Sequence, residues 1–346
     1  MKKRYIIYVC FFLLIIFGFG MFGLPTKPVL PTIQLPGEVI FAWPEGSALR
    51  QFFGGGFTNT MVGTIITWII VLGLVLSLRA RSRTADEVPT GFYNFFEMIV
   101  EGAYGFVEGA AGKWAKTFFP YFMSFILVIL IANWLELVPF VDSFGKMENL
   151  SEHHVEVAEA AAQADGVELT EEDVNVIQDE AQTEGGKQNG IFLLRANEGE
   201  EAGWQVIPFV RAAATDLNFT IGFALLSVIM TQYYGVKALG LGYFKKFFNF
   251  NADEIAKNPL GLMDFAVGLL ELISELGKIL SFGFRLFGNI FAGQVLLFII
   301  GFLLPFAHLA VTGFEFLIGL IQALIFAVLT LTFMAGATVS HSAEEH

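Results

Sequence analysis

The sequence has few charged residues for its length, and this scarcity excludes an ordinary soluble domain. Asp, Glu, Lys and Arg account for 15% of the 346 residues, whereas hydrophobic residues account for 55% and the mean hydropathy is +0.63. Soluble domains carry about 25% charged residues. Apolar stretches of about 20 residues, long enough to cross a ~30 Å hydrocarbon core, recur along the chain. The composition predicts an all-α membrane protein with about five to six transmembrane helices.

The sequence also lacks the features of several functional classes. Cys10 is the single cysteine, which excludes an intrachain disulfide. The sequence has no basic stripe that would bind nucleic acid and no G-x-x-x-x-G-K-[ST] loop that would bind a nucleotide. His153 and His154 are adjacent in an acidic stretch, which is typical of a solvated surface and not of a metal site. We therefore expect no cofactor, no metal and no enzymatic activity of the chain on its own.

The negative charge is confined to one segment. Residues 142–201 hold 16 Asp or Glu residues against three Lys or Arg residues, which accounts for the entire formal charge of −13. The segment is poor in hydrophobic residues and rich in Gln, Ala, Glu and Gly. This composition predicts a solvated loop, with one short helix near Leu150 to Ala162.

Changes in composition divide the chain into six parts. They are, in order, an N-terminal transmembrane segment or signal at 1–24, an extracytoplasmic linker at 25–58, two membrane spans with an interfacial helix between them at 59–140, an acidic extracytoplasmic loop at 141–211, a third core span with a cytoplasmic loop at 212–257, and a long helical hairpin at 258–346. The first part has a basic start and an apolar run, which fits a span and a cleaved signal alike.

Two basic loops indicate the orientation of the chain. Arg79, Arg81 and Arg83 follow one apolar run, and three lysines within residues 237–246 follow another. Cytoplasmic loops carry an excess of Lys and Arg, so both loops are expected on the cytoplasmic side. The acidic segment is then extracytoplasmic, and the C-terminus is cytoplasmic.

The last part of the chain, from about Leu260 to Val339, reads as two apolar arms broken near Gly301 to Pro305. Each arm exceeds 30 residues, so it must tilt strongly in a bilayer or lie partly in the membrane plane. Polar residues recur at helical spacing on both arms. They are Glu271, Ser274, Lys278, Ser281, Arg285 and Asn289 on the first arm, and Thr312, Glu315, Gly319, Gln322 and Thr330 on the second.

Arg285 and Glu315 are the residues least compatible with a purely structural role. Arg285 is surrounded in sequence by Phe and Leu, and an arginine at that depth costs at least ~2.5 kcal/mol. It cannot escape this cost by losing its proton, so it needs a water-filled cavity or an acidic partner. Glu315 is the single carboxylate in the apolar body of its arm, and a buried carboxyl group can take up and release a proton.

Three functions compete to explain these residues. An ion path uses both of them, whereas a secondary transporter would use Arg285 to hold an anionic substrate at the membrane midplane. A scaffold without transport is the third possibility. The sequence shows no inverted repeat of the hairpin, which disfavours the transporter, and a scaffold leaves the cost of burying Arg285 unexplained.

The segment Ser281 to Gly293, SFGFRLFGNIFAG, resembles the signature of the a subunit of F-type ATP synthases, whose essential arginine begins an RLFGN core. The resemblance covers roughly residues 55–140 and 205–346. Further matching features are Asn133 and Glu136 in NWLELVP, Asp216 and Asn218 in the TDLN run, Glu271 ahead of the arginine, and Gln322 in LIQALIF.

The resemblance implies a stator subunit of the ATP synthase membrane sector in the cell inner, energy-coupling membrane. Two aqueous half-channels would pass protons to and from a carboxylate on the c-subunit ring. The implied partners are that ring, b-type peripheral stalk subunits, the F1 head indirectly, and the lipid bilayer. Arg285 would separate the half-channels, Glu315 would relay protons, and Glu271 would belong to the cytoplasmic half-channel. The polar neighbours implied are Asn289, Gln294, Gln322, Ser281, Ser274, Lys278, Asp216 and Asn218.

The sequence departs from the family at one pair of positions. The family often has an acidic residue where Gln294 stands and a histidine where Glu315 stands. Gln294 lies nine residues, or half a turn in net rotation, from Arg285, so it should face away from the ring. We therefore expect Glu315 to be the ionisable member of this pair.

The composition of the acidic segment 142–201 cannot form a membrane core. We therefore expect this segment to be dispensable for proton passage.

Overall fold

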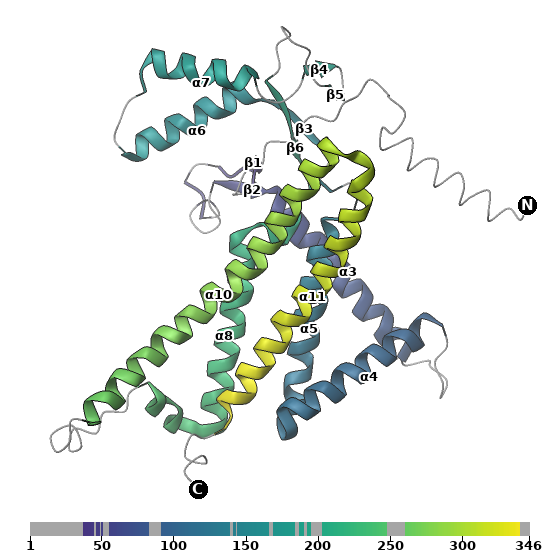
Figure 1. Cartoon of the computed structure of the whole chain (residues 1–346), viewed down its shortest axis with the longest axis vertical. Coiled ribbons are helices and arrows are strands. Elements are labelled where there is room, and N and C mark those ends of the chain that lie inside the picture. Colours follow the sequence, from purple (N-terminus) through teal and green to yellow (C-terminus); the bar gives the residue numbers. More distant parts are fainter. Residues whose placement is uncertain are drawn as a thin grey trace, which may run out of the picture. The chain divides into compact units, whose positions relative to one another are not determined.

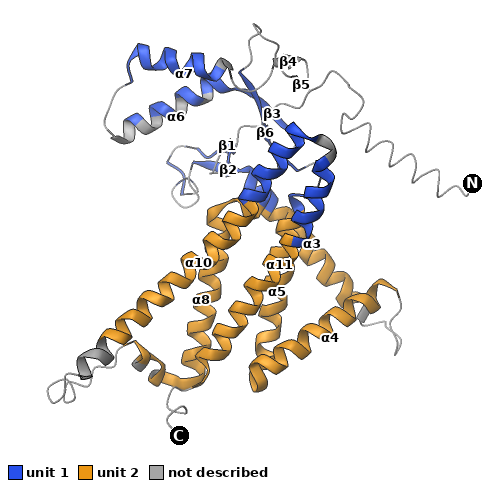
Figure 2. Ribbon diagram, in the orientation of Figure 1, with its two compact units in different colours: residues 1–63, 135–212, 291–317 blue, residues 64–134, 213–290, 318–346 orange. Residues whose placement is uncertain are grey.

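The structure, a computed structural model, describes most of the chain, and the predicted N-terminal segment 1–24 lies outside the described residues. These residues are 37–44, 46–48, 50, 55–82, 91–138, 141–142, 144–165, 169–183, 187–189, 192–194, 203–247 and 260–339. Two compact units share them (Figure 2). Unit 1 consists of residues 1–63, 135–212 and 291–317, and unit 2 of residues 64–134, 213–290 and 318–346.

Long helices dominate the described chain (Figure 1). They are α3 (Asn59–Ser82), α4 (Phe92–Ala111), α5 (Ala115–Leu135), α8 (Leu217–Leu239), α10 (Leu260–Leu303) and α11 (Pro305–Ala337), with 3₁₀ turns η1 (Gly112–Trp114), η2 (Ala213–Thr215) and η3 (Gly240–Lys246). Five stretches, with α4, η1 and α5 counted together as one, are long and apolar enough to cross a membrane. The predicted all-α membrane fold is confirmed.

The predicted hairpin of two long arms corresponds to α10 and α11, which are 44 and 33 residues long. Only Leu304 separates them, which agrees with the expected break near Gly301 to Pro305. At 1.5 Å per residue, α10 is about 66 Å long, roughly twice the thickness of a hydrocarbon core.

Unit 2 is held together by an aromatic-rich core on α5 and α8. Phe118 and Phe125 on α5 are buried, and the ring of Phe118 packs edge-on against Tyr234 of α8 at 5.0 Å between centroids. The Tyr234 hydroxyl donates to the Tyr121 hydroxyl at 3.1 Å. Phe282 of α10 and Phe326 of α11 also belong to this core. The packing fixes the buried face of α10 within unit 2 and leaves its opposite face exposed.

Unit 1 contains the acidic segment, which is more ordered than the predicted loop. Two helices, α6 (Leu150–Asp165) and α7 (Glu171–Thr183), lie side by side in this segment, whereas the sequence predicted a single short helix. Leu150 of α6 and Ala181 of α7 are completely buried. Two helices burying small apolar faces against each other can fold despite a strongly acidic surface. The composition of the segment concealed this pattern.

Short antiparallel ribbons complete unit 1. They are β1 (Val39–Ala42) with β2 (Gly56–Thr58), β3 (Gly145–Asn149) with β6 (Trp204–Pro208), and β4 (Lys187–Asn189) with β5 (Phe192–Leu194). The β3–β6 ribbon pairs Asn149 with Trp204 and Gly145 with Pro208. This pairing therefore brings together the two chain segments that flank residues 150–203.

Candidate functional site

Arg285 lies on the exposed face of α10, in unit 2. Its Nη2 atom donates to Ser281 Oγ, one turn earlier, at 3.2 Å, and its guanidinium lies 5.8 Å from the centroid of the Phe282 ring. The next residue, Leu286, is completely buried. The predicted pair Ser281 and Arg285 therefore shares one side of α10, directed away from the core of unit 2.

The surface around Arg285 is strongly apolar. Phe284 is 52% exposed and Leu280 53% exposed, and Leu276 and Ile273 continue the same exposed surface toward the start of α10. Ser274 is also exposed on this part of the helix. A cation set in an apolar, membrane-embedded surface is costly unless water or an anionic group meets it. This face is suited to bind a partner that carries a carboxylate.

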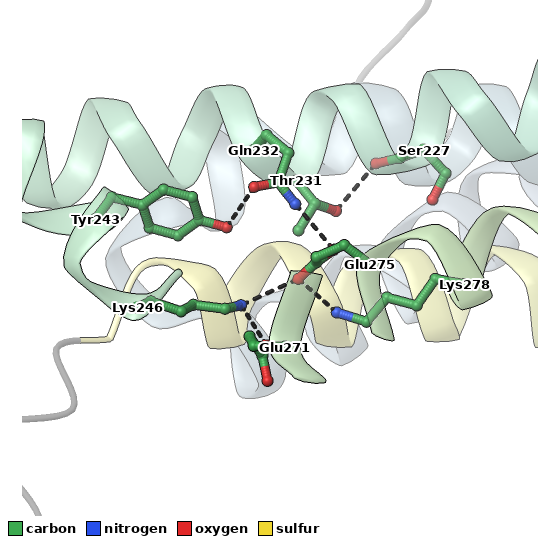
Figure 3. A network of polar contacts seen from close by, with 8 residues as sticks. All are labelled: Ser227, Thr231, Gln232, Tyr243, Lys246, Glu271, Glu275 and Lys278. Carbon is green, nitrogen blue, oxygen red and sulfur yellow. Dashed lines mark hydrogen bonds and ion pairs between the residues drawn. The ribbon is translucent and has the colours of Figure 1, made fainter. Parts of the chain in front are cut away.

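A polar network joins α10 to α8 and η3 within unit 2 (Figure 3). The Glu275 carboxylate, 5% exposed as a residue, accepts from Lys278 at 2.8 Å, from Lys246 at 3.0 Å and from Gln232 Nε2 at 2.9 Å. Tyr243 donates to Gln232 Oε1 at 2.8 Å. Two ammonium groups and an amide thus satisfy this buried charge.

The predicted residues Glu271 and Lys278 belong to the same network. Lys246 binds Glu271 Oε1 at 2.7 Å in addition to Glu275. Burial lowers the pKa of Lys246, but its hydrogen bonds to both carboxylates outweigh burial and raise the pKa above its usual value. Lys246 therefore stays charged and ties η3 to α10.

A second polar cluster lies in unit 1 around Gln294, which is 3% exposed. Gln294 Nε2 donates to Asp142 Oδ2 at 3.0 Å, and Arg211 Nη2 donates to Gln294 Oε1 at 3.5 Å. Arg211 is itself 4% exposed. The buried guanidinium of Arg211 also attracts the Asp142 carboxylate. The amide of Gln294 bridges this cation and anion.

Carboxylates extend this cluster toward α11. Glu136, just after α5, is within electrostatic reach of Asp142, Arg211 and Glu315. Glu315 is 8% exposed and lies against Gly293 of α10: a methyl group added at Gly293 would lie 2.5 Å from Glu315 Oε2. The predicted residues Gln294 and Glu315 thus belong to one cluster, in unit 1.

Asp142 is placed to exchange a proton near neutral pH. Burial raises its pKa from the usual 3.8 to about 7, against the lowering effects of Arg211 and of the hydrogen bond from Gln294. The oxygens Asp142 Oδ1 and Glu136 Oε1 are buried and accept no hydrogen bond from any described residue. A proton or a water molecule is the natural partner for such oxygens.

The other predicted residues occupy varied places. Asp216 caps α8 and accepts from the Asn218 backbone N–H at 2.8 Å, which gives it a structural role of its own. Asn218 is exposed and lines a largely apolar groove of unit 2 together with Phe125 and Phe223. Gln322 is 7% exposed, and Asn289 Nδ2 is buried without a partner among the described residues.

The sequence indicated no role in the site for Arg211 and Asp142, and Glu275 was grouped with Glu271 and Lys278 near the cytoplasmic end but was not among the predicted site residues. Arg211 and Asp142 lie in or beside non-helical segments, where no periodicity marks a shared face. Glu275 lies four residues after Glu271 and resembles a charge at the membrane surface. The available signal for Arg211 was a single cation in an apolar stretch, five residues before Asp216 and the start of a predicted span.

Comparison with known proteins covers both clusters. The family model described as ATP synthase A chain matches residues 61–335. An ATP synthase subunit a of Mycobacterium ulcerans is 27% identical over 288 residues, which are 81% of this chain and 86% of the relative. That of Syntrophobacter fumaroxidans is 25% identical over 274 residues, 78% of this chain and 82% of the relative. That of Aliivibrio fischeri is 36% identical over 153 residues, 41% of this chain and 52% of the relative.

The matched region contains the arginine face of α10, the Glu275 network and the Gln294 cluster. It includes the five apolar helical stretches almost completely. With the match covering well over half of the sequence, the chain belongs to the ATP synthase A chain family, the membrane-embedded a subunits of F-type ATP synthases.

Proposed function

We propose that this chain carries protons to and from a carboxylate on a c-subunit ring and so couples ion flow to rotation. The exposed, apolar face of α10 around Arg285 is the observation that supports this best. A ring carboxylate would supply the anion that the guanidinium needs when deprotonated, and would leave it when protonated. The permanent charge of Arg285 would prevent protons from passing directly between the two half-channels.

The two polar clusters supply groups for the two half-channels. The unit 1 cluster contains Asp142, Glu136, Gln294, Arg211 and Glu315. Two of its carboxylate oxygens accept no hydrogen bond from the described part of the chain, so they can accept a proton or a water molecule, and we assign the cluster to the extracytoplasmic half-channel. The network around Glu271 and Glu275 serves the cytoplasmic half-channel. Arg211 balances part of the negative charge of the unit 1 cluster and lowers the pKa of Asp142 and Glu136, which favours the release of protons that burial holds on these carboxyl groups.

The orientation follows from the basic loops and completes the proposal. Arg79 and Lys237 lie near the C-terminal ends of α3 and α8. The positive-inside rule assigns these ends to the cytoplasm, and the acidic helices α6 and α7 would then lie outside. In a Cys10→Ser background, a cysteine placed at Glu172 should react with a membrane-impermeant thiol reagent added outside intact cells. Reaction from the cytoplasmic side alone would overturn the orientation.

Arg285→Ala in the assembled complex tests the proposed function. ATP-driven proton pumping in inverted vesicles should be abolished, and Arg285→Lys should lose most of it, because an ammonium lacks the planar fork and can shift its pKa. Near-normal pumping by Arg285→Ala would remove the central claim. If the purified protein carried no ring of small hairpin subunits and no nucleotide-hydrolysing head, an anion transporter would be the better explanation.

A further inference from the structure

Asn59 forms a junction of hydrogen bonds at the start of α3, in unit 1. It is completely buried. Its side chain accepts from the Glu38 N–H at 3.1 Å and donates from Nδ2 to Glu38 Oε2 at 2.7 Å and to the Pro208 carbonyl at 3.1 Å. Its N–H donates to the Glu38 carbonyl at 3.0 Å, and its carbonyl accepts from the Arg211 N–H at 3.3 Å. Asn59 thereby bridges Glu38 and the backbone of Arg211.

The chain before Asn59 approaches α3 too closely for a larger residue at position 37. A methyl group added at Gly37 would lie 2.5 Å from Thr60 Oγ1. Three of the Asn59 hydrogen bonds go to Glu38 itself, two through backbone atoms and one through the carboxylate. The position of the Glu38 carboxylate is therefore fixed by its own backbone and by Asn59.

Glu38 extends the carboxylates of the unit 1 cluster by one member. Its negative charge acts on Asp142 and raises the pKa of that residue, Asp142 acts on Glu136, and Glu136 is in turn influenced by Glu315. Each carboxylate in this series thus lies within electrostatic reach of the next, from Glu38 beside β1 to Glu315 in α11. Glu38 is partly exposed, whereas Asp142 Oδ1 and Glu136 Oε1 are buried. The partly exposed member comes from a segment that precedes the family match at residue 61.

We infer that Glu38 is the outermost proton-exchanging group of the extracytoplasmic half-channel, supplied by a segment outside the region shared with the family. The inference rests on the proposed function. Glu38 takes a proton from a hydronium ion, forming a carboxyl O–H bond and releasing water. It then passes that proton through water to the Asp142 carboxylate and returns to its ionised form.

The charge of Glu38, and not merely its shape, distinguishes this role from a structural contact. Glutamine at position 38 keeps an oxygen that accepts from Asn59 Nδ2, so the junction survives in Glu38→Gln. The charged groups that act on Asp142 are Glu38 and Arg211, and Asp142 in turn acts on Glu136. Removing the Glu38 charge also relieves repulsion of the Asp142 carboxylate, which lowers the pKa of Asp142 and weakens its capture of protons at neutral pH.

The test is ATP synthesis by the whole complex in proteoliposomes, driven by an ion-diffusion potential while the pH on the extracytoplasmic side is varied. Glu38→Gln should lower the rate about tenfold where that side is neutral or alkaline. The negative charge of Glu38 at the entrance of the half-channel raises the local concentration of cations, and the variant lacks it. The loss should shrink where that side is acidic. Glu38→Asp should retain most of the rate, and Glu159→Gln, on the exposed surface of α6, should match the unmodified protein.

Rates are normalised to the amount of complex recovered, so poor assembly of one variant does not obscure the result. Equal losses in Glu38→Gln and Glu38→Asp at every pH would overturn the inference and leave a structural contact. So would a Glu38→Gln rate equal to that of Glu159→Gln. If Arg285→Ala abolishes synthesis while Glu38→Gln is unaffected, only this inference fails; if Arg285→Ala retains synthesis, the proposed function fails.

Discussion

The two arginines near the helical hairpin sit in opposite electrostatic settings. Arg211 is buried and meets its compensating groups, Gln294 and Asp142, within the chain. Arg285 is exposed among Phe284 and Leu280, and Ser281 gives it only a hydroxyl. A neutral hydroxyl does not balance a guanidinium charge in hydrocarbon. Arg211 is thus suited to tune carboxylates of its own chain, and Arg285 to meet a charge brought by another.

Glu315 supports a prediction about the identity of the titrating group. Glu315→Gln should slow pumping strongly while leaving assembly intact, because shape and hydrogen bonding survive and proton exchange does not. Gln294→Glu combined with Glu315→His should recover part of the activity, since it restores the arrangement common in the family. Pumping rates of purified variant complexes across the working pH range decide the matter. An unmodified rate in Glu315→Gln at every pH would show that water alone carries the proton.

Asp142 supports a prediction about pH. Its pKa of about 7 in the folded protein exceeds the usual 3.8, so the folded state binds an extra proton between these values. The contribution of this residue to stability therefore rises as pH falls through about 7 and is lost as pH rises through it. Infrared spectra should show a protonated carboxyl band that fades near pH 7. The band should be missing in Asp142→Asn; its persistence there would assign it to Glu136 or another carboxyl group.

Sequence pattern located some of these residues and not others, for a physical reason. Arg285 and Gln294 were predicted to face opposite ways because both lie on one regular helix, and the structure exposes the first and buries the second. Helical spacing carries that information directly. Asp142 and Arg211 meet through a non-helical region and a ribbon, 69 positions apart, and no local pattern encodes such a contact.

At the scale of elements, the Glu275 network fastens η3 and α8 to α10. Glu275→Gln removes a buried charge bound by Lys246 and Lys278 and should destabilise the protein by about 3 kcal/mol. Glu271→Gln is the matched control, because Glu271 also binds Lys246 but its side chain is 36% exposed, and it should cost less than about 1 kcal/mol. Thermal unfolding of the purified variants in detergent compares them. Equal shifts in Tm would contradict the assignment of Glu275 as the anchor.

The β3–β6 ribbon changes how the acidic segment should be deleted. Removal of all of 142–201 would also remove Asp142, which belongs to the Gln294 cluster. Asn149 pairs with Trp204 at the end of the ribbon, so residues 150–203 can be replaced by a two-residue turn. This deletion should leave proton pumping close to normal, because α6 and α7 bury their apolar faces mainly on each other. Loss of pumping in an assembled complex would show that the acidic helices contribute to coupling.

For the whole molecule, composition and hydropathy predicted the membrane class and the long hairpin correctly. These properties depend on the length of apolar runs, which the sequence states directly. The folding of the acidic segment was predicted less well, because its order depends on a few buried contacts such as Leu150 and Ala181 in a highly charged surface. Composition averages over such contacts.

Each compact unit is assembled from three stretches of sequence that alternate along the chain. A ribosome therefore delivers parts of both units before either is complete. Unit 1 lacks the end of α10 and the start of α11 until residue 317 has been made, and unit 2 waits for residues 318–346. Nascent chains that stop before residue 291 carry Glu136, Asp142 and Arg211 without Gln294 and Glu315. In such chains these three residues lack the two partners that complete their cluster, so we expect truncated chains to be degraded faster than the full-length chain.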